Sequence, residues 1–108
     1  MAFWETIDVQ MRNAGFQPVN HKPNWYFRVE NPVLYLVCLL DGREDGWREE
    51  SGTFSGFARS MEKRLEEFFC TRLVAVSVLV DNEGDTLPVD IVETGTTLKE
   101  NDLDVVET

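Results

Sequence analysis

The sequence is poor in the residues that build most catalytic and metal sites. Its 108 residues include one histidine, two cysteines and four prolines. A single imidazole, His21, excludes any metal site that needs several histidine ligands. The two cysteines could form one disulfide, but Cys38 and Cys70 both lie in apolar surroundings, which favours two reduced, buried thiols in a cytosolic protein.

Long hydrophobic runs are also missing. No apolar run approaches the ~20 residues that cross a bilayer. The N-terminus carries acidic residues early and lacks the basic region and apolar block of a secretory signal. We therefore expect one globular domain, large enough for its own hydrophobic core, with no direct membrane insertion by this segment.

Basic residues are scarce in the last quarter of the chain. Residues 1–80 contain 11 acidic and 9 basic residues, whereas residues 81–108 contain 9 acidic residues and one basic residue, Lys99. An acidic tail repels the phosphates of nucleic acids and anionic lipid headgroups. This distribution argues against nucleic-acid binding.

Hydrophobic periodicity predicts a helix, three strands, a second helix and one or two further strands. The first helix, of about 12 residues, ends before Gly15, and the second runs from about residue 54 to 69. The runs VLYLVCLL (33–40) and RLVAVSVLV (72–80) are typical of strands covered on both faces. The stripe predicted to be buried on the second helix consists of Phe54, Phe57, Ala58, Met61, Leu65, Phe68 and Phe69.

Two strands buried on both faces need two covering layers, and two amphipathic helices can supply them. The predicted fold class is therefore α/β, a helix/sheet/helix sandwich with a mixed sheet of four or five strands. The second helix connects the two apolar strands, which makes them parallel. We expect a single compact domain over residues 1–93, followed by an acidic linker or loosely docked tail over residues 94–108.

The acidic segment 41–53, between a strand and the second helix, is the first candidate for a site. Read as an EF-hand loop from Asp41, it has Arg43 and Gly52 where oxygen ligands are required. The segment DNEGD (81–85) has acidic residues but a misplaced glycine, so only a weak divalent-cation association with either loop stays open. We predict no metal site and no cofactor.

Hydrolase and nuclease chemistry also lack support. In GTFSG the serine is displaced from the position that a nucleophile elbow requires. Ser51, Thr53 and Ser55 are better interpreted as alternative N-caps of the second helix. The order of elements matches a restriction-endonuclease-like scaffold, but the strand VLYLVCLL carries no acidic metal ligand, so we predict that scaffold without its active site and no catalytic residue.

Trp47 is the one large apolar residue of the acidic segment. Its side chain either folds back over the sheet edge as an anchor or is exposed as a contact for a partner. In the second case Asp45 and Glu49 flank it, and we predict Trp47, Asp45 and Glu49 as partner contacts.

An ordered set of short features resembles a known family. The features are an aromatic first helix ending in AGF, then WYFRVENP, the acidic DGREDGW, MEKRLEEFF and LVAVSVLV. Over roughly residues 3–92 the chain resembles the N-terminal cytosolic domain of rhomboid intramembrane serine proteases from Gram-positive bacteria. In that family a serine–histidine dyad lies inside the membrane bundle, and neither Ser55 nor His21 corresponds to it.

The resemblance implies a non-catalytic regulatory or interaction domain. Its partner would be another protein or the membrane domain of its own protein, and it would lie in the cytoplasm, tethered to the inner face of the membrane. The alternative is a stand-alone acidic adaptor or chaperone-like α/β protein that holds a basic partner. A small enzyme whose site the sequence does not reveal is the third alternative.

Overall fold

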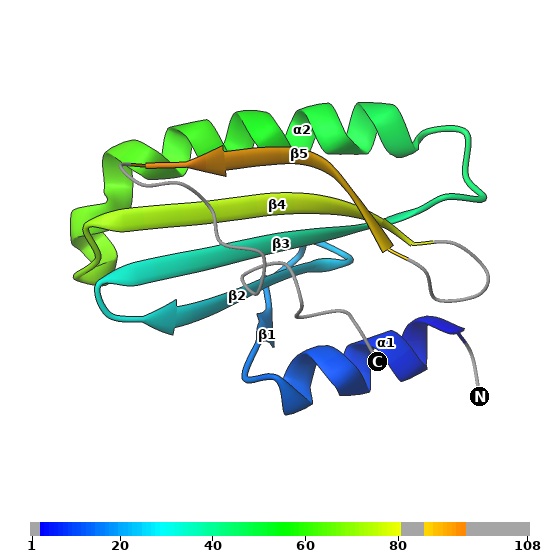
Figure 1. Ribbon diagram of the computed structural model, residues 1–108, viewed down its shortest axis with the longest axis horizontal. Coiled ribbons are helices and arrows are strands. Elements are labelled where there is room, and N and C mark those ends of the chain that lie inside the picture. The colour runs from blue at the N-terminus through cyan, green and yellow to red at the C-terminus, as the bar shows by residue number, and fades with distance from the viewer. Residues whose placement is uncertain (1–2, 81–85, 95–108) are drawn as a thin grey trace.

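The computed structural model describes residues 3–80 and 86–94, and it has the predicted order of elements (Figure 1). Helix α1 is followed by three strands, helix α2, a 3₁₀ helix η1 and two more strands. The bounds are α1 Phe3–Asn13, β1 Gln17–Pro18, β2 Trp25–Glu30, β3 Val33–Asp41, α2 Trp47–Met61, η1 Glu62–Phe68, β4 Arg72–Val80 and β5 Thr86–Glu93.

The strands form one mixed sheet in the order β1-β2-β3-β4-β5. Strands β3 and β4 are parallel, with Leu36 opposite Ala75, and the other neighbours are antiparallel. The parallel pair follows from the connection, because α2 and η1 carry the chain from the end of β3 back to the start of β4. The predicted mixed sheet is confirmed.

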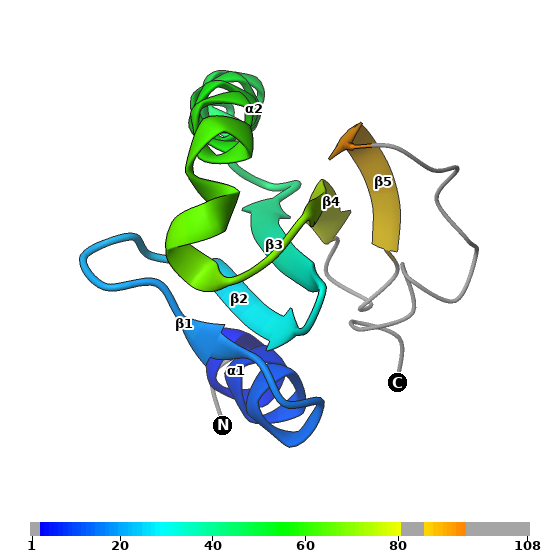
Figure 2. The same cartoon turned by 90° about the vertical axis from the view of Figure 1, so that its left-hand side faces the viewer.

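The helices cover opposite faces of this sheet, as Figure 2 shows. Successive residues of β3 alternate between the two faces, so each helix packs against one half of its side chains. On the α2 face the core includes Leu34, Leu36, Cys38, Leu40, Phe54, Ala58, Met61, Leu73 and Ala75. On the α1 face it includes Ile7, Met11, Phe16, Tyr26, Val37, Leu39, Val76, Val78 and Val80.

Helix α2 begins at Trp47, well before the predicted start near residue 54. Its N-cap is Gly46, and no side chain caps it, so the interpretation of Ser51, Thr53 and Ser55 as N-caps is wrong. Ser51 and Ser55 belong to the body of the helix, and both are buried. Serine and glycine are weak helix formers, but packing overrides this local preference.

The end of the predicted buried stripe also needs correction. The helix tightens to 3₁₀ geometry at Glu62, and Phe69 adopts a left-handed conformation with φ 58°. Phe69 is 84% exposed, whereas the next residue, Cys70, is buried. The N–H of Phe69 donates to the carbonyl of Glu66 and that of Cys70 to the carbonyl of Leu65, so the chain reverses here and places the thiol inward.

Neighbouring residues at the start of β2 face different helices. The ring of Trp25 lies 5.2 Å from that of Phe54, on the α2 face, although its place at the start of an aromatic strand would also allow packing against the first helix. Tyr26 does face α1, where its hydroxyl donates to Asp8 at 2.7 Å. The alternation of a strand separates the two aromatic side chains.

The predicted acidic tail falls largely outside the described residues. Its first residue, Thr94, is tied to β4: its N–H donates to the carbonyl of Leu73 at 3.0 Å, and its hydroxyl accepts from the Leu73 N–H at 2.8 Å. The segment DNEGD (81–85) also lies outside the described residues.

Replacing Leu65 by alanine tests the packing of the second helical segment. Leu65 is 7% exposed and belongs to the core on the α2 face, so truncation leaves a cavity. We expect a loss of ~2–5 kcal/mol in the free energy of unfolding, measured by urea denaturation. Leu87→Ala is the control, because Leu87 is 63% exposed and its truncation should cost less than ~0.5 kcal/mol. Equal costs for the two variants would contradict the assignment of the buried face.

Candidate functional site

The acidic loop is held by its own residues at the end of β3. The Asp41 carboxylate accepts three hydrogen bonds from Arg43: from its backbone N–H at 2.9 Å, from Nε at 2.8 Å and from Nη2 at 2.7 Å. The Trp4 side chain also contributes a hydrogen bond. The Arg43 guanidinium, more than any other group, lowers the pKa of Asp41 to about 2, against an opposing effect of burial. Asp41 therefore stabilises the turn.

The loop also comes close to the end of β4. The N–H of Gly42 donates to the carbonyl of Val80 at 2.9 Å. A Cβ atom at residue 42 would lie 3.2 Å from that carbonyl oxygen, so the close approach favours glycine. The loop between β3 and α2 is shorter than predicted, because the helix already begins at Trp47.

The three residues predicted as partner contacts lie near one another along the chain but differ in exposure. Trp47, the first residue of α2, is partly buried and packs against the core on the α2 face. The Arg48 guanidinium lies 5.0 Å from the centroid of its ring. Asp45 and Glu49 are exposed. Trp47 is thus placed as an anchor, and a contact of Asp45 and Glu49 with a partner stays a prediction.

A polar cleft of about 360 Å³ lies beside this loop. It joins the start of α1, the segment before β2, the loop and the first turns of α2, and its lining residues are Trp4, Asn24, Asp41, Glu44, Gly46 and Glu50. Carboxylates near a helix N-terminus are stabilised by the helix dipole. Within residues 3–80 and 86–94, no group of three or more His, Cys, Asp or Glu side chains is placed to hold a metal ion.

The serines of α2 connect the helix to the sheet. The hydroxyl groups of Ser51 and Ser77 share a buried hydrogen bond of 3.0 Å, and Ser55 donates to the Asp90 carboxylate. His21 is exposed in the segment between β1 and β2. These polar pairs fix α2 on β4 and β5, and they were not predicted, because each joins residues far apart in the sequence.

An apolar groove of about 140 Å³ lies at the other end of the α2 face. Strands β2 and β3 form its floor, α2 and η1 form one wall, and the segment after β1 forms the other. The lining residues are Val19, Asn20, Phe27, Leu34, Leu36, Phe57, Met61 and Phe68. Among the lining residues that the structure describes, Asn20 has the one polar side chain and none is titratable, so these residues can hold an apolar group.

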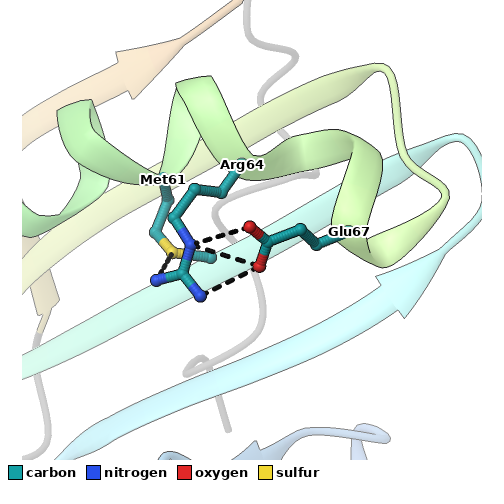
Figure 3. A network of polar contacts seen from close by, with 3 residues as sticks. All are labelled: Met61, Arg64 and Glu67. Atoms are coloured by element: carbon teal, nitrogen blue, oxygen red, sulfur yellow. Dashed lines mark hydrogen bonds and ion pairs between the residues drawn. The ribbon is translucent and has the colours of Figure 1, made fainter.

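Arg64 contacts Met61, one of the residues that line this groove, as Figure 3 shows. Its Nη1 atom is 4.0 Å from the Met61 sulfur, and its Nη2 atom lies 2.9 Å from the Glu67 carboxylate. Both partners of this ion pair are more than half exposed. The hydrogen bonds from Arg64 lower the pKa of Glu67. Exposed pairs of this kind contribute little to stability.

A second cation, Lys22, lies on the side of the groove near Phe57, whereas Arg64 contacts Met61. The Lys22 ammonium is 5.0 Å from the centroid of the Trp25 ring, and that ring lies 5.1 Å from Phe57, which lines the groove. Lys22 also lines a shallow hollow that shares Val19 with the groove. No ion pair joins Lys22 to another described residue.

Two large apolar side chains outside the groove lining are exposed. Val29 is 45% exposed and lies opposite Leu34 in the β2–β3 pair, and Phe69 directly follows Phe68. Phe57, Met61 and Phe68 were predicted to be buried in the core, and the groove that they line was not predicted. The available signal was the width of the helical stripe, which includes the consecutive residues Phe68 and Phe69.

Comparison with known proteins identifies no relative. No family model matches this chain, and neither a curated protein nor a solved structure matches it significantly. None of the described helices is long and apolar enough to cross a membrane.

The Ser51–Ser77 pair can be tested with a double-mutant cycle. Ser77→Ala leaves the buried Ser51 hydroxyl without its partner, and we expect a loss of ~1–3 kcal/mol in the free energy of unfolding. Ser51→Ala should have a similar effect. The double variant should cost clearly less than the two single variants together, because no hydroxyl then stays unpaired. Additive costs in urea denaturation would contradict a direct interaction.

Asp41→Asn tests the turn at the end of β3. The pKa of Asp41 in the folded protein is lowered to about 2, so its charge stabilises the fold above the unfolded pKa of ~3.9. This contribution is lost as the pH falls toward 2. Because Arg43 is half exposed, we expect the variant to lose only ~1–2 kcal/mol at pH 7.

Urea denaturation between pH 7 and pH 2 measures the effect. The difference between the wild type and Asp41→Asn should shrink as the pH falls. The control Asp45→Asn changes an exposed carboxylate and should stay within ~0.5 kcal/mol of the wild type throughout. A difference for Asp41→Asn that does not depend on pH would rule out the charge as its cause.

Proposed function

We propose that this chain is a non-catalytic interaction domain, and that it is the N-terminal cytosolic domain of a rhomboid-type intramembrane serine protease. In this proposal the catalytic serine–histidine dyad belongs to membrane segments outside the 108 residues. The domain lies in the cytoplasm, tethered to the inner face of the membrane. Its partner is another protein or the membrane domain of its own protein.

One observation carries the assignment to protein binding: apolar surface remains exposed after both helices have packed on the sheet. The groove beside α2 and η1 is lined almost entirely by apolar side chains, and two further apolar side chains, Phe69 and Val29, are 84% and 45% exposed. Exposing a large apolar side chain such as Phe69 forfeits the free energy of its burial. Apolar surface with a polar rim is a typical feature of interaction sites.

The remaining polar groups favour binding over catalysis. Ser55 is 4% exposed and donates its hydrogen bond to the Asp90 carboxylate, in the contact between α2 and the sheet. Both thiols are buried, and burial raises the pKa of Cys38 to about 12, which disfavours a nucleophilic thiolate. The Ser55 hydroxyl and the two thiols are thus buried parts of the folded core and are not positioned to attack a substrate.

The family assignment is supported by the ordered features of the sequence. The aromatic helix α1, the WYFRVENP strand and turn, and the acidic segment with Trp47 follow one another in one compact unit. A domain of this kind acts by raising the local concentration of a bound partner beside the protease. The domain would regulate the protease or recruit its partner, and the membrane domain would cleave the substrate.

A stand-alone acidic adaptor is the second candidate, and the polar cleft favours it. Asp41, Glu44 and Glu50 line this cleft, and among residues 3–80 and 86–94 no basic side chain lines it. A cleft of this charge attracts a basic side chain of a partner. In the adaptor hypothesis the cleft is the main binding surface.

The reading frame after the codon for Thr108 discriminates between the two candidates. The rhomboid proposal expects several apolar segments of ~20 residues downstream, one of them with a Gly-x-Ser-Gly sequence. The measurement is sequencing of the gene beyond codon 108. A stop codon directly after Thr108 would overturn the rhomboid assignment and favour the adaptor.

A further inference from the structure

We propose that the groove beside α2 and η1 binds one large apolar side chain from an acidic segment of a partner protein. The inference rests on the proposed function only in that the chain binds a protein, and it adds the surface and the chemistry of the partner. It concerns the groove lined by Phe27, Phe57, Met61 and Phe68 and not the polar cleft at the other end of α2.

The size of the groove sets the number of side chains that it can hold. Its volume of about 140 Å³ is close to that of an engineered cavity of ~150 Å³ in another protein that binds benzene. One aromatic or branched aliphatic side chain fits this space, whereas the face of a helix presents several. The partner segment therefore inserts a single anchor residue.

The lining defines the chemistry of that anchor. Leu34 and Leu36 of the floor are almost fully buried, and Phe57, Met61 and Phe68 provide polarisable walls. Aromatic rings and a thioether contact an inserted aromatic ring favourably. Asn20 is the one polar lining residue, and its amide can both donate to and accept from the backbone beside the anchor.

The charge beside the groove defines the residues that flank the anchor. Lys22 lies on one side, where it stacks on Trp25 and has no ion pair with a described residue. Arg64 lies near Met61, and its guanidinium forms an exposed ion pair with Glu67. Residues 1–80 are nearly neutral, with 11 acidic and 9 basic residues, so these two cations are not outweighed by the overall charge of this part of the chain. Carboxylates on both sides of the anchor complement them.

Arg64 can change partners when the segment binds. In the free protein its guanidinium contacts both the Met61 sulfur and the Glu67 carboxylate, as Figure 3 shows. A carboxylate next to the inserted side chain would compete with Glu67 for the same N–H groups. Because the existing pair is exposed to solvent, this exchange costs little.

Amide chemical shifts of the full, isotope-labelled chain provide the test. The probe is the synthetic peptide acetyl-Glu-Asp-Phe-Asp-Glu-amide. One control peptide replaces the phenylalanine by glycine, and the other replaces all four acidic residues by lysine. We expect saturable shifts at the amides of Asn20, Phe57 and Phe68 with the probe. The glycine peptide should bind at least tenfold more weakly, and the lysine peptide at least fivefold more weakly.

Two charge variants separate the groove from non-specific attraction. Lys22→Glu should weaken binding of the probe peptide at least fivefold, because it reverses the charge on one side of the groove. Lys63→Glu makes the same change at an exposed residue with no contact to the groove among the described interactions, and it should stay within twofold of the wild type. Equal effects of the two variants would overturn the site.

Other outcomes would overturn the proposal in distinguishable ways. If the lysine peptide binds and shifts Glu44 and Glu50, the polar cleft is the binding surface and the adaptor hypothesis gains. If the probe shifts the amides of Leu103 and Val105 together with the groove, it displaces the chain's own tail, which contradicts a separate partner. If the probe causes no shift at the groove, the groove does not bind acidic segments, whatever the reading frame after Thr108 shows.

Discussion

The fold depends on one constraint, namely that the parallel pair β3–β4 has to be covered on both faces. Nearly every residue of both strands is buried, and the two faces of β3 alone present Leu34, Leu36 and Leu40 on one side and Val37 and Leu39 on the other. Exposing either face would remove the hydrophobic free energy that outweighs the conformational entropy of the chain. Helices α1 and α2 are therefore not interchangeable additions, since each shields a different half of the same strands (Figure 2).

This arrangement also determines which parts of the molecule are left for function. The middle of α2 is fixed by Ser51 and Ser55, which are hydrogen-bonded to the sheet, so this part of the helix is committed to the fold. Near the two ends of α2 the helix does not cover the sheet completely, which leaves a polar cleft at one end and an apolar groove at the other. The N-terminal end has the acidic cleft, and the C-terminal end has the apolar groove beside two cations. The contrast between the two depressions is the basis for assigning an acidic, singly anchored partner to the groove.

Much of the fold could be predicted from the sequence, because the strong signals are the long apolar runs and the periodic helices. The order of elements and the two-sided burial of residues 33–40 and 72–80 follow from such patterns. The start of α2 could not be predicted in this way. Ser51, Gly52 and Ser55 resemble the start of a helix, and only the structure shows that the two serines bond to Ser77 and Asp90. The groove was missed for a related reason: periodicity tells that Phe57, Met61 and Phe68 are apolar, but not whether the sheet is wide enough to cover them.

Native-state hydrogen exchange of the backbone amides tests the central claim most directly. If β3 and β4 are the doubly covered centre, the amides of Val37, Leu39, Val76 and Val78 should exchange only through global unfolding. Their free energies of exchange would then equal the free energy of unfolding from denaturant. Amides near the end of η1, next to the exposed Phe69, should exchange through smaller openings. Exchange of the β3 and β4 amides as fast as those of η1 would contradict the account, because a strand pair buried under two helices cannot open locally.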